Sequence, residues 1–514
     1  MLFRSTPKPP ATCPFAGHSL AVFPANTTSQ ADTTTVAHTP LAVAGSAPTP
    51  PVEQGSLLQF SDDPIACMRR LHRKHGDLAV LQEGGQKLVF VFSPELNRQV
   101  LADGDTFQSQ FFAVRGSRNS AQRRVTSGLL SQNGTEHRDT RRLLKDVFAK
   151  KALPGYHGII CRLTDELTTR WNRESHVDLN GEMVQFMLRM TSALLFGLDD
   201  PEFAEKLGRL IDRWTHRNHE VGMGALVSAP QFARGYELLL QQAEELESSI
   251  REMFARHRSG NSDGLNILHL LMQATESGGS MTDDQLTGHA TLLFAAAHLT
   301  TAHTFSWTLF LLAQHPDVLA RLTHELQTHV AGDVPTLDEL EQLKYLDAVI
   351  RESMRILPAS SYSQRVTAGA TSLGPLQLNP GTPVIFSQFI THHRADLYEQ
   401  PDRFIPERWE HIAPSPYAYL PFGAGPRMCI GAPLAVVEIR TALTIMLKRF
   451  HFQIEPSCTV DGRVISTMLG PTTPIPASLL PASQLPRTVP VNGSIHSLVE
   501  LPPAALPATQ RRAA

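Results

Sequence analysis

The chain has 514 residues, of which 42% are hydrophobic and 18% are charged, a composition typical of a globular protein with a large core. Its formal net charge of −3 gives no indication of a nucleic-acid partner or of a strongly acidic substrate. The five cysteines are widely spaced and match neither a disulfide framework nor a zinc site, so we expect a reducing, cytoplasmic location.

Composition divides the chain into three parts. Residues 1–51 are rich in Thr, Ala, Pro and Ser and predict a disordered N-terminal arm. Residues 52–482 predict one ordered domain, and residues 483–514 predict a disordered Pro/Ala-rich C-terminal tail. No segment reaches the roughly 18 consecutive apolar residues of a membrane span, so we expect a soluble protein without a membrane anchor.

The first elements of the ordered part are a hairpin and a series of helices. Residues 77–93 predict a β-hairpin that turns at Gly84 and Gly85. Apolar residues then recur at three- and four-residue steps, which predicts helices over 141–153, 161–172, 236–257 and 266–274.

The second half of the chain contains the longest predicted helix. Residues 282–317 begin with acidic residues and end near Pro316, and because they are apolar on most sides we expect this helix to cross the middle of the protein. Residues 337–358 predict two helices, the second ended by Pro358, and 375–388 predict a hairpin that turns at Asn-Pro-Gly. The predicted fold class is mainly α with a small β-sheet region.

A single cysteine lies in a glycine-rich loop, PFGAGPRMCIGAP (421–433), directly before a predicted helix. Glycines let backbone N–H groups approach a thiolate, and the positive end of the following helix would lower the thiol pKa. The guanidinium of Arg427 suits an anionic group beside a bound metal. A buried structural cysteine is the alternative for such a loop taken alone.

The spacing Phe422-x-x-Gly425-x-Arg427-x-Cys429-x-Gly431 resembles the haem-binding signature of the cytochrome P450 family, the haem-thiolate monooxygenases. The resemblance implies a cytochrome P450 fold, a single large haem-binding domain with haem b as cofactor. It also implies that Cys429 is the metal ligand. The other loop residues expected to contact the haem are Arg427, Phe422, Gly423 and Gly431.

Further segments resemble the family in the same order. Glu352 and Arg355 match its Glu-x-x-Arg helix, and Arg408 matches the third member of that buried structural network; an exposed ion pair is the alternative. His137 and Arg141 would face one side of a helix and hold a haem propionate, with Arg365 as another partner. A basic surface stripe is the alternative for this set.

The long central helix carries Ala296-Ala297-His298-Leu299-Thr300-Thr301, which resembles the family's oxygen-activation motif. Thr300 and Thr301 are the expected catalytic residues, and the Thr300 hydroxyl can also bond to the carbonyl of Ala296. The family's acid is replaced by Leu299, which cannot deliver a proton. In the family the position of His298 tends to point away from the haem.

The resemblance implies a monooxygenase that inserts one atom of O2 into a small, partly apolar organic substrate. Its electrons would come from a separate donor such as a ferredoxin or flavodoxin with its reductase. Leu299 leaves open a peroxide-dependent or rearranging enzyme, and a non-catalytic haem sensor or carrier is a further alternative. The residues expected to line the substrate pocket are Phe111, Phe112, Phe294, Ala297, Ser361, Tyr362 and Met468.

Overall fold

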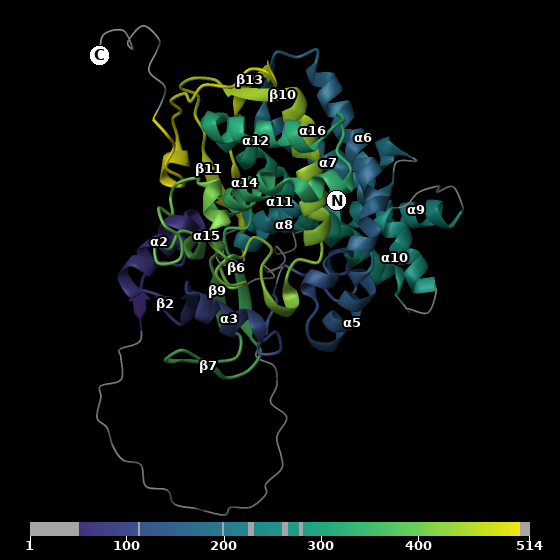
Figure 1. The fold of residues 1–514 in the computed structure, drawn as a ribbon. Coiled ribbons are helices and arrows are strands. Elements are labelled where there is room, and N and C mark those ends of the chain that lie inside the picture. The colour runs from purple at the N-terminus through teal and green to yellow at the C-terminus, as the bar shows by residue number, and fades with distance from the viewer. Residues whose placement is uncertain are drawn as a thin grey trace, which may run out of the picture.

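The computed structural model describes residues 51–110, 114–197, 200–224, 231–259, 266–276 and 281–503. Figure 1 shows that helices form most of the molecule and that the strands gather in small sheets. The predicted fold class, mainly α with a small β-sheet region, is therefore confirmed. Among the described residues, no helix combines the length and the hydropathy needed to cross a membrane.

Helices form most of both halves of the chain; those of the N-terminal half come first. They are α1 (Leu58–Asp62), α2 (Pro64–His75), α3 (Pro94–Ala102), α4 (Ala121–Val125), α5 (Gly134–Lys145), α6 (Leu153–Trp171), α7 (Leu179–Phe196), α8 (Pro201–Gly224) and α9 (Gln231–Arg258). Those of the C-terminal half are α10 (Ile267–Glu276), α11 (Asp283–Gln314), α12 (Pro316–His329), α13 (Leu337–Gln342), α14 (Lys344–Ile356), α15 (Gln388–His392) and α16 (Ala432–Arg449).

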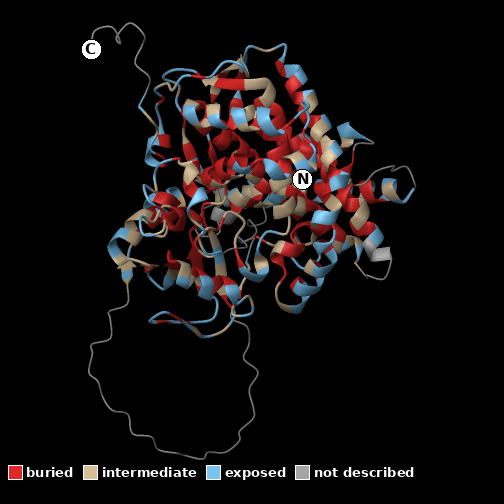
Figure 2. Ribbon diagram, in the orientation of Figure 1, coloured by how far each residue is buried: buried red, intermediate tan, exposed pale blue. Residues whose placement is uncertain are grey.

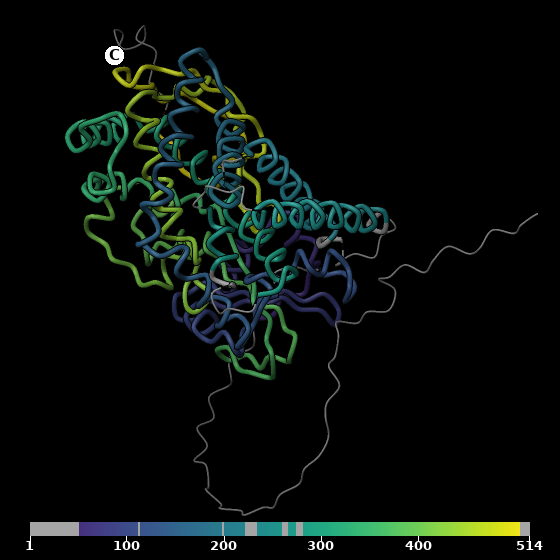
Figure 3. Tube along the Cα trace, turned by 90° about the vertical axis from the view of Figure 1, so that its right-hand side faces the viewer, coloured from purple at the N-terminus to yellow at the C-terminus, as the bar shows by residue number. Residues whose placement is uncertain are grey.

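The largest sheet has the strand order β1 (Val52–Gln54), β2 (Leu78–Glu83), β3 (Gln86–Val91), β9 (Pro383–Phe386), β6 (Ser363–Thr367) and β4 (Phe107–Gln108). A second sheet joins β10 (Phe450–Ile454), β13 (Pro476–Pro481) and β5 (His176–Asp178). Two further pairs are β7 (Thr371–Leu373) with β8 (Leu376–Leu378), and β11 (Gly462–Ile465) with β12 (Met468–Pro471). Figures 1 and 3 both show the β7–β8 hairpin at the end of the molecule opposite β10 and β13.

The long central helix is as predicted. Thr282 caps α11 through a reciprocal pair of bonds with Gln285, and two acidic residues follow in the first turn, where the helix dipole favours them. The 32 residues of α11 span about 48 Å, and the helix ends at Gln314, before Pro316. It contacts α4, α7, α8, α14 and α16, so it crosses the core, where Figure 2 shows the buried residues concentrated.

One predicted hairpin is confirmed and the other is wrong. β2 and β3 pair antiparallel across Gly84, whose φ of 57° suits a tight turn. In the segment 375–388, however, β8 pairs with β7, and β9 pairs with β3 and β6. The Asn-Pro-Gly turn faces β6 instead, because the N–H of Gly381 donates to the carbonyl of Thr367 at 2.8 Å.

The predicted helix over 141–153 is also wrong, because the chain turns between α5 and α6. α5 ends at Lys145, and the turn that follows buries Val147 and Phe148. Pro154 lies in the first turn of α6, where its missing N–H is tolerated, so it marks the start of a new helix. The predicted helix 161–172 is the C-terminal part of α6.

The C-terminal boundary predicted at residue 483 requires correction, because residues 483–503 pack on the domain. Val491, Ile495, Leu498 and Val499 are buried in the main hydrophobic core. The N–H of Asn492 also donates to the carbonyl of Cys458 at 2.8 Å. The proline content that predicted disorder is therefore offset by four apolar side chains whose partners lie far away in the sequence.

Candidate active site around Cys429

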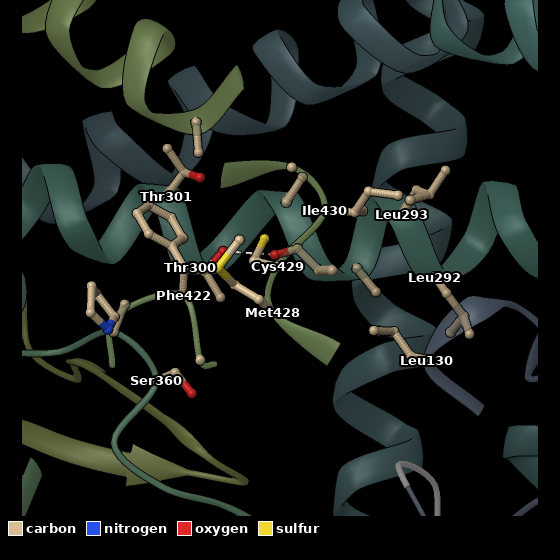
Figure 4. Close-up of a pocket in the computed structure, with 18 of the residues that line it drawn as sticks. Leu130, Leu292, Leu293, Thr300, Thr301, Ser360, Phe422, Met428, Cys429 and Ile430 are labelled. Atoms are coloured by element: carbon tan, nitrogen blue, oxygen red, sulfur yellow. Dashed lines mark hydrogen bonds between the residues drawn. The ribbon is translucent and has the colours of Figure 1, made fainter. Parts of the chain in front are cut away.

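A cavity of about 370 Å³ lies between α11 and the loop that precedes α16. Its wall contains Cys429 from this loop, Thr300 from α11 and Arg365 from β6. Figure 4 shows side chains of α11 and of the loop, among them Thr300, Phe422 and Cys429, on the same cavity. The cavity therefore brings together residues that are far apart in the sequence.

The backbone around Cys429 is held in place by a close approach to α3. Gly425 has a φ of 71°, and a Cβ at this residue would collide with the carbonyl oxygen of Leu101. The N–H of Cys429 donates to the carbonyl of Phe422 at 2.8 Å, which closes the loop. The α16 helix then begins at Ala432, with proline in its first turn as expected.

The Cys429 thiolate needs a nearby positive charge to stabilise it. Burial raises the pKa of the Cys429 thiol, although the side chain is open to the cavity. The N–H groups of Gly431 and Ala432 and the charge of Arg141 lower the pKa, but they do not outweigh burial. The N-terminal end of α16 therefore lowers the thiol pKa less than the sequence predicted. A bound metal cation would supply the positive charge that stabilises a thiolate here.

Metal ligation at this site would need ligands from outside the chain. Among the described residues, no group of three or more His, Cys, Asp or Glu side chains is arranged to hold a metal ion. Cys429 would therefore be a single protein ligand. A porphyrin, which supplies its own four nitrogen ligands, suits this arrangement.

Four basic residues line the same cavity: His137 and Arg141 of α5, Arg365 of β6, and Arg427 of the loop. His137 is buried, the three arginines are half-buried, and all four line the cavity, so the set is not the surface stripe considered above. None of the four forms an ion pair with a carboxylate in the part of the chain that the structure describes. Arg141 donates instead to the carbonyl of Met428 at 2.6 Å.

The positive charges of this cluster disfavour one another. Burial and then the charge of Arg427 lower the pKa of Arg365 to about 10, and burial and then Arg141 lower the pKa of Arg427 to about 10. Burial, followed by the neighbouring arginines, lowers the pKa of His137 to about 4. An anionic ligand would relieve this repulsion, so the cluster fits the two carboxylates of a haem.

The predicted network around Glu352 lies in the core and not at the surface. Arg355 donates to Glu352 at 2.8 Å, and both side chains are fully buried. Arg408 donates to the same carboxylate at 2.9 Å, and the indole of Trp409 donates to it at 3.0 Å. Arg355 also donates to the carbonyl of Pro401, so the network joins α14 to the segment around residue 401.

The residues of the segment 296–301 of α11 differ in whether they face the cavity. The Thr300 hydroxyl donates to the carbonyl of Ala296 at 2.7 Å, as expected. Thr300 and Thr301 line the cavity, whereas Leu299 does not. His298 lies on the far side of α11, where its Nδ1 is 3.5 Å from a carboxylate oxygen of Asp212.

The residues predicted for the substrate pocket divide into three groups. Ala297 and Met468 line the cavity. Phe294 packs against Phe196 away from it, and Ser361 and Tyr362 turn their hydroxyls to the carbonyls of Thr467 and Ser466, so these three do not line it. Phe111 and Phe112 lie outside the described residues.

Sequence reasoning missed much of the cavity wall. The apolar members that it missed include Leu129, Leu130, Leu194, Leu195, Leu292 and Leu293, and the polar ones include Thr191, Thr215, His219 and His289. Extending the face of Thr300 backwards by helical steps would have reached Leu293 and His289. The residues of α7 and α8 carry no such signal, because the contacts of these helices with the cavity depend on tertiary packing.

Known proteins resemble this chain in sequence and in fold. Residues 46–474 match the family described as Cytochrome P450. A cyclooctat-9-en-7-ol 5-monooxygenase of Streptomyces melanosporofaciens is 29% identical over 400 residues, which are 75% of this chain and 84% of that protein. A pentalenene oxygenase of Streptomyces avermitilis is 27% identical over 439 residues, 84% of this chain and 96% of that protein. The structure titled retinoic acid bound cyanobacterial CYP120A1 shares the fold, with a TM-score of 0.73, 21% identity, and coverage of 85% of this chain and all of that chain.

Proposed function

The chain belongs to the cytochrome P450 family and is a haem-dependent monooxygenase, and on this premise we propose that it oxidises a small, largely apolar organic substrate with electrons from separate donor proteins. The observation that carries the proposal is the shared cavity, in which Cys429, Thr300 and the basic cluster of His137, Arg141, Arg365 and Arg427 meet. A ferredoxin or flavodoxin with its reductase, in the cytoplasm, is the proposed source of electrons.

In the proposed arrangement, Cys429 holds the haem iron, and the haem supplies the oxidation of the substrate by O2. The basic cluster holds the haem carboxylates. This role is supported by the mutual repulsion of its positive charges, which bound carboxylates would relieve. Phe422, Gly423 and Gly431 line the cavity beside Cys429, where glycine leaves room for a flat ligand.

The proposed substrate is a compact, mainly hydrocarbon molecule. Leucines of α7, α11 and the segment before α5 supply most of the wall away from Cys429. Such a wall binds apolar surface and excludes water from the oxidation. By their names, the relatives act on pentalenene and on cyclooctat-9-en-7-ol, so we propose a carbocyclic substrate of this kind.

Thr300 is the proposed proton-handling residue. Its hydroxyl proton is engaged by the carbonyl of Ala296, which leaves the hydroxyl oxygen free to accept a bond from water in the cavity. Thr301 lines the cavity next to it. Leu299 supplies no acid, so protons would arrive through water held by these hydroxyls.

Leu299 also favours a second candidate, an enzyme that uses peroxide in place of O2 and a donor. A turnover assay over a panel of carbocyclic hydrocarbons and their alcohols decides between them, with ferredoxin, reductase and O2 in one arm and peroxide alone in the other. We expect product in the first arm and a severalfold lower yield of product per electron for Thr300→Val. Product in the peroxide arm alone would overturn the monooxygenase proposal.

The ligand assignment is tested separately by Cys429→Ser. We expect the reduced, carbon-monoxide-bound wild type to show the red-shifted absorbance band of thiolate-ligated haem, and the variant to lack this band. Circular dichroism of both proteins controls for folding. The same band in the variant would exclude Cys429 as the ligand.

A further inference from the structure

His289 lines the cavity and, among the described residues, has a buried hydrogen-bond donor without an acceptor. Its side chain is 1% exposed, and its Nδ1 accepts a hydrogen bond from the N–H of Leu129 at 3.3 Å. Burial lowers the pKa of His289 to about 4, so the ring is neutral near pH 7. Because Nδ1 is the acceptor, the proton is on Nε2, which has no partner among the described residues.

The orientation of this ring is fixed by the backbone. A Cβ on Gly128 would lie 2.6 Å from the carbonyl oxygen of Gly288, and a Cβ on Gly288 would lie 2.8 Å from the nitrogen of Gly128. The two segments can approach this closely only because both residues are glycine. The contact holds Leu129 against α11 and thus positions the His289 ring without the help of a ligand.

His289 lies far from the reacting end of the cavity but on the same face of α11 as Thr300. Eleven residues separate the two, which corresponds to about 16 Å along the helix axis and a rotation of only about 20°. Leu293 and Ala296 lie between them on this face and also line the cavity. In Figure 4, Leu292 and Leu293 extend along α11 away from Thr300 and Thr301. An apolar stretch therefore separates two polar positions.

Two further residues of the cavity wall have hydroxyls without a partner in the part of the chain that the structure describes. Thr191 of α7 and Thr215 of α8 are buried, and among the described residues neither hydroxyl has a hydrogen bond. Threonines of α11 behave differently, since Thr291 and Thr304 donate to carbonyls four residues earlier in their helix. Among the described residues, the cavity wall thus includes several residues with unpaired polar groups, which a folded protein rarely tolerates without a ligand or water.

We propose that His289 anchors an oxygen atom of the substrate, which is therefore an apolar skeleton that carries a hydroxyl, ether or carbonyl oxygen at the end remote from the carbon to be oxidised. Thr191 and Thr215 are additional hydroxyls for a substrate with more than one oxygen. This inference rests on the proposed function and specifies the substrate class. A bond from the Nε2–H group to such an oxygen orients the molecule along α11 and so selects which carbon faces Thr300.

The test uses ligands with one carbocyclic skeleton: cedrane, cedrol and cedryl methyl ether. Binding to the haem-loaded protein is measured by equilibrium dialysis. We expect cedrol and the methyl ether to bind about tenfold more tightly than cedrane, because an unpaired buried donor gains its acceptor. The methyl ether only accepts hydrogen bonds, so its tight binding would identify a donor on the protein.

Matched variants assign the effect to His289. His289→Phe should abolish the preference for the oxygenated ligands, and His289→Gln, which keeps an N–H donor, should retain most of it. His315→Phe is the control, because His315 does not line the cavity. Equal binding of all three ligands by the wild type, or an unchanged preference in His289→Phe, would overturn the proposal. A thiolate-type carbon-monoxide band in the same preparation would show that the anchor alone had failed; a missing band would mean that the proposed function had failed.

Discussion

Two groups of ionisable side chains in this protein have opposite arrangements: the group around Glu352 is buried, whereas the basic cluster at the cavity combines a buried histidine with three half-buried arginines. Around Glu352, each charge has partners: one carboxylate accepts from Arg355, Arg408 and Trp409. Around the cavity, the basic cluster of His137, Arg141, Arg365 and Arg427 has no carboxylate partner among the described residues. Burial of charge is unfavourable in both groups, but within the described part of the chain only the first group has a carboxylate partner. Paired buried charge therefore indicates a structural brace, and unpaired buried charge indicates a ligand.

The largest effect is expected from breaking the compensated group. Glu352→Ala leaves two arginines buried without their carboxylate, which should lower the free energy of unfolding by about 3–5 kcal/mol. Urea denaturation of the haem-free protein measures this loss. Arg138→Ala is the control, because its ion pair with Asp105 is exposed and its removal should change the free energy of unfolding by less than about 1 kcal/mol. Similar losses for the two variants would contradict the distinction.

The second group should respond in the opposite way. Arg365→Leu removes one unpaired charge, so the free energy of unfolding of the haem-free protein should stay within about 1 kcal/mol of the wild type or rise. The affinity for haem should nevertheless fall about tenfold or more, because a bond to a haem carboxylate is lost.

Transfer of haem to an excess of apomyoglobin measures this affinity. Arg138→Leu serves as the control, since Arg138 lies on α5 beside the cluster but does not line the cavity. An Arg365→Leu protein that is destabilised without haem and retains haem normally would place Arg365 among the structural charges.

Local patterns predicted what depends on neighbours in the sequence. Helical periodicity and capping residues located α11 and its end, and the fixed spacing around Cys429 located the loop. The positions of His137, Arg141, Arg365 and Arg427 came from family resemblance, and the structure brings all four to one cavity. That they lack carboxylate partners among the described residues could not be read from the sequence, because pairing depends on which distant segments meet.

The errors concern contacts between distant segments. β9 joins β3 and β6 in place of its neighbour β8, since strand pairing is decided by the whole sheet. Ser361 and Tyr362 were predicted to face the substrate, but carbonyls around residue 467 take up their hydroxyls. The Nε2–H group of His289 was missed because only tertiary structure supplies Leu129 as the partner of its other nitrogen.

The predicted effect that is smallest near pH 7 is a dependence of stability on pH in the unpaired group. The pKa of His137 is lowered to about 4 in the folded protein, below its ordinary value of 6.5, so the unfolded chain binds more protons between these values. The stabilising contribution of neutral His137 is complete above pH 6.5 and is lost as the pH falls towards 4. In the haem-free protein, His137→Gln should therefore make the free energy of unfolding depend less steeply on pH. The slope should fall by at most about 1.4 kcal/mol per pH unit, which corresponds to one bound proton. Haem should diminish this difference, because its carboxylates stabilise protonated His137. Denaturation series from pH 4 to 7 with and without haem test both points; an equal difference in the two series would mean that no anion reaches His137.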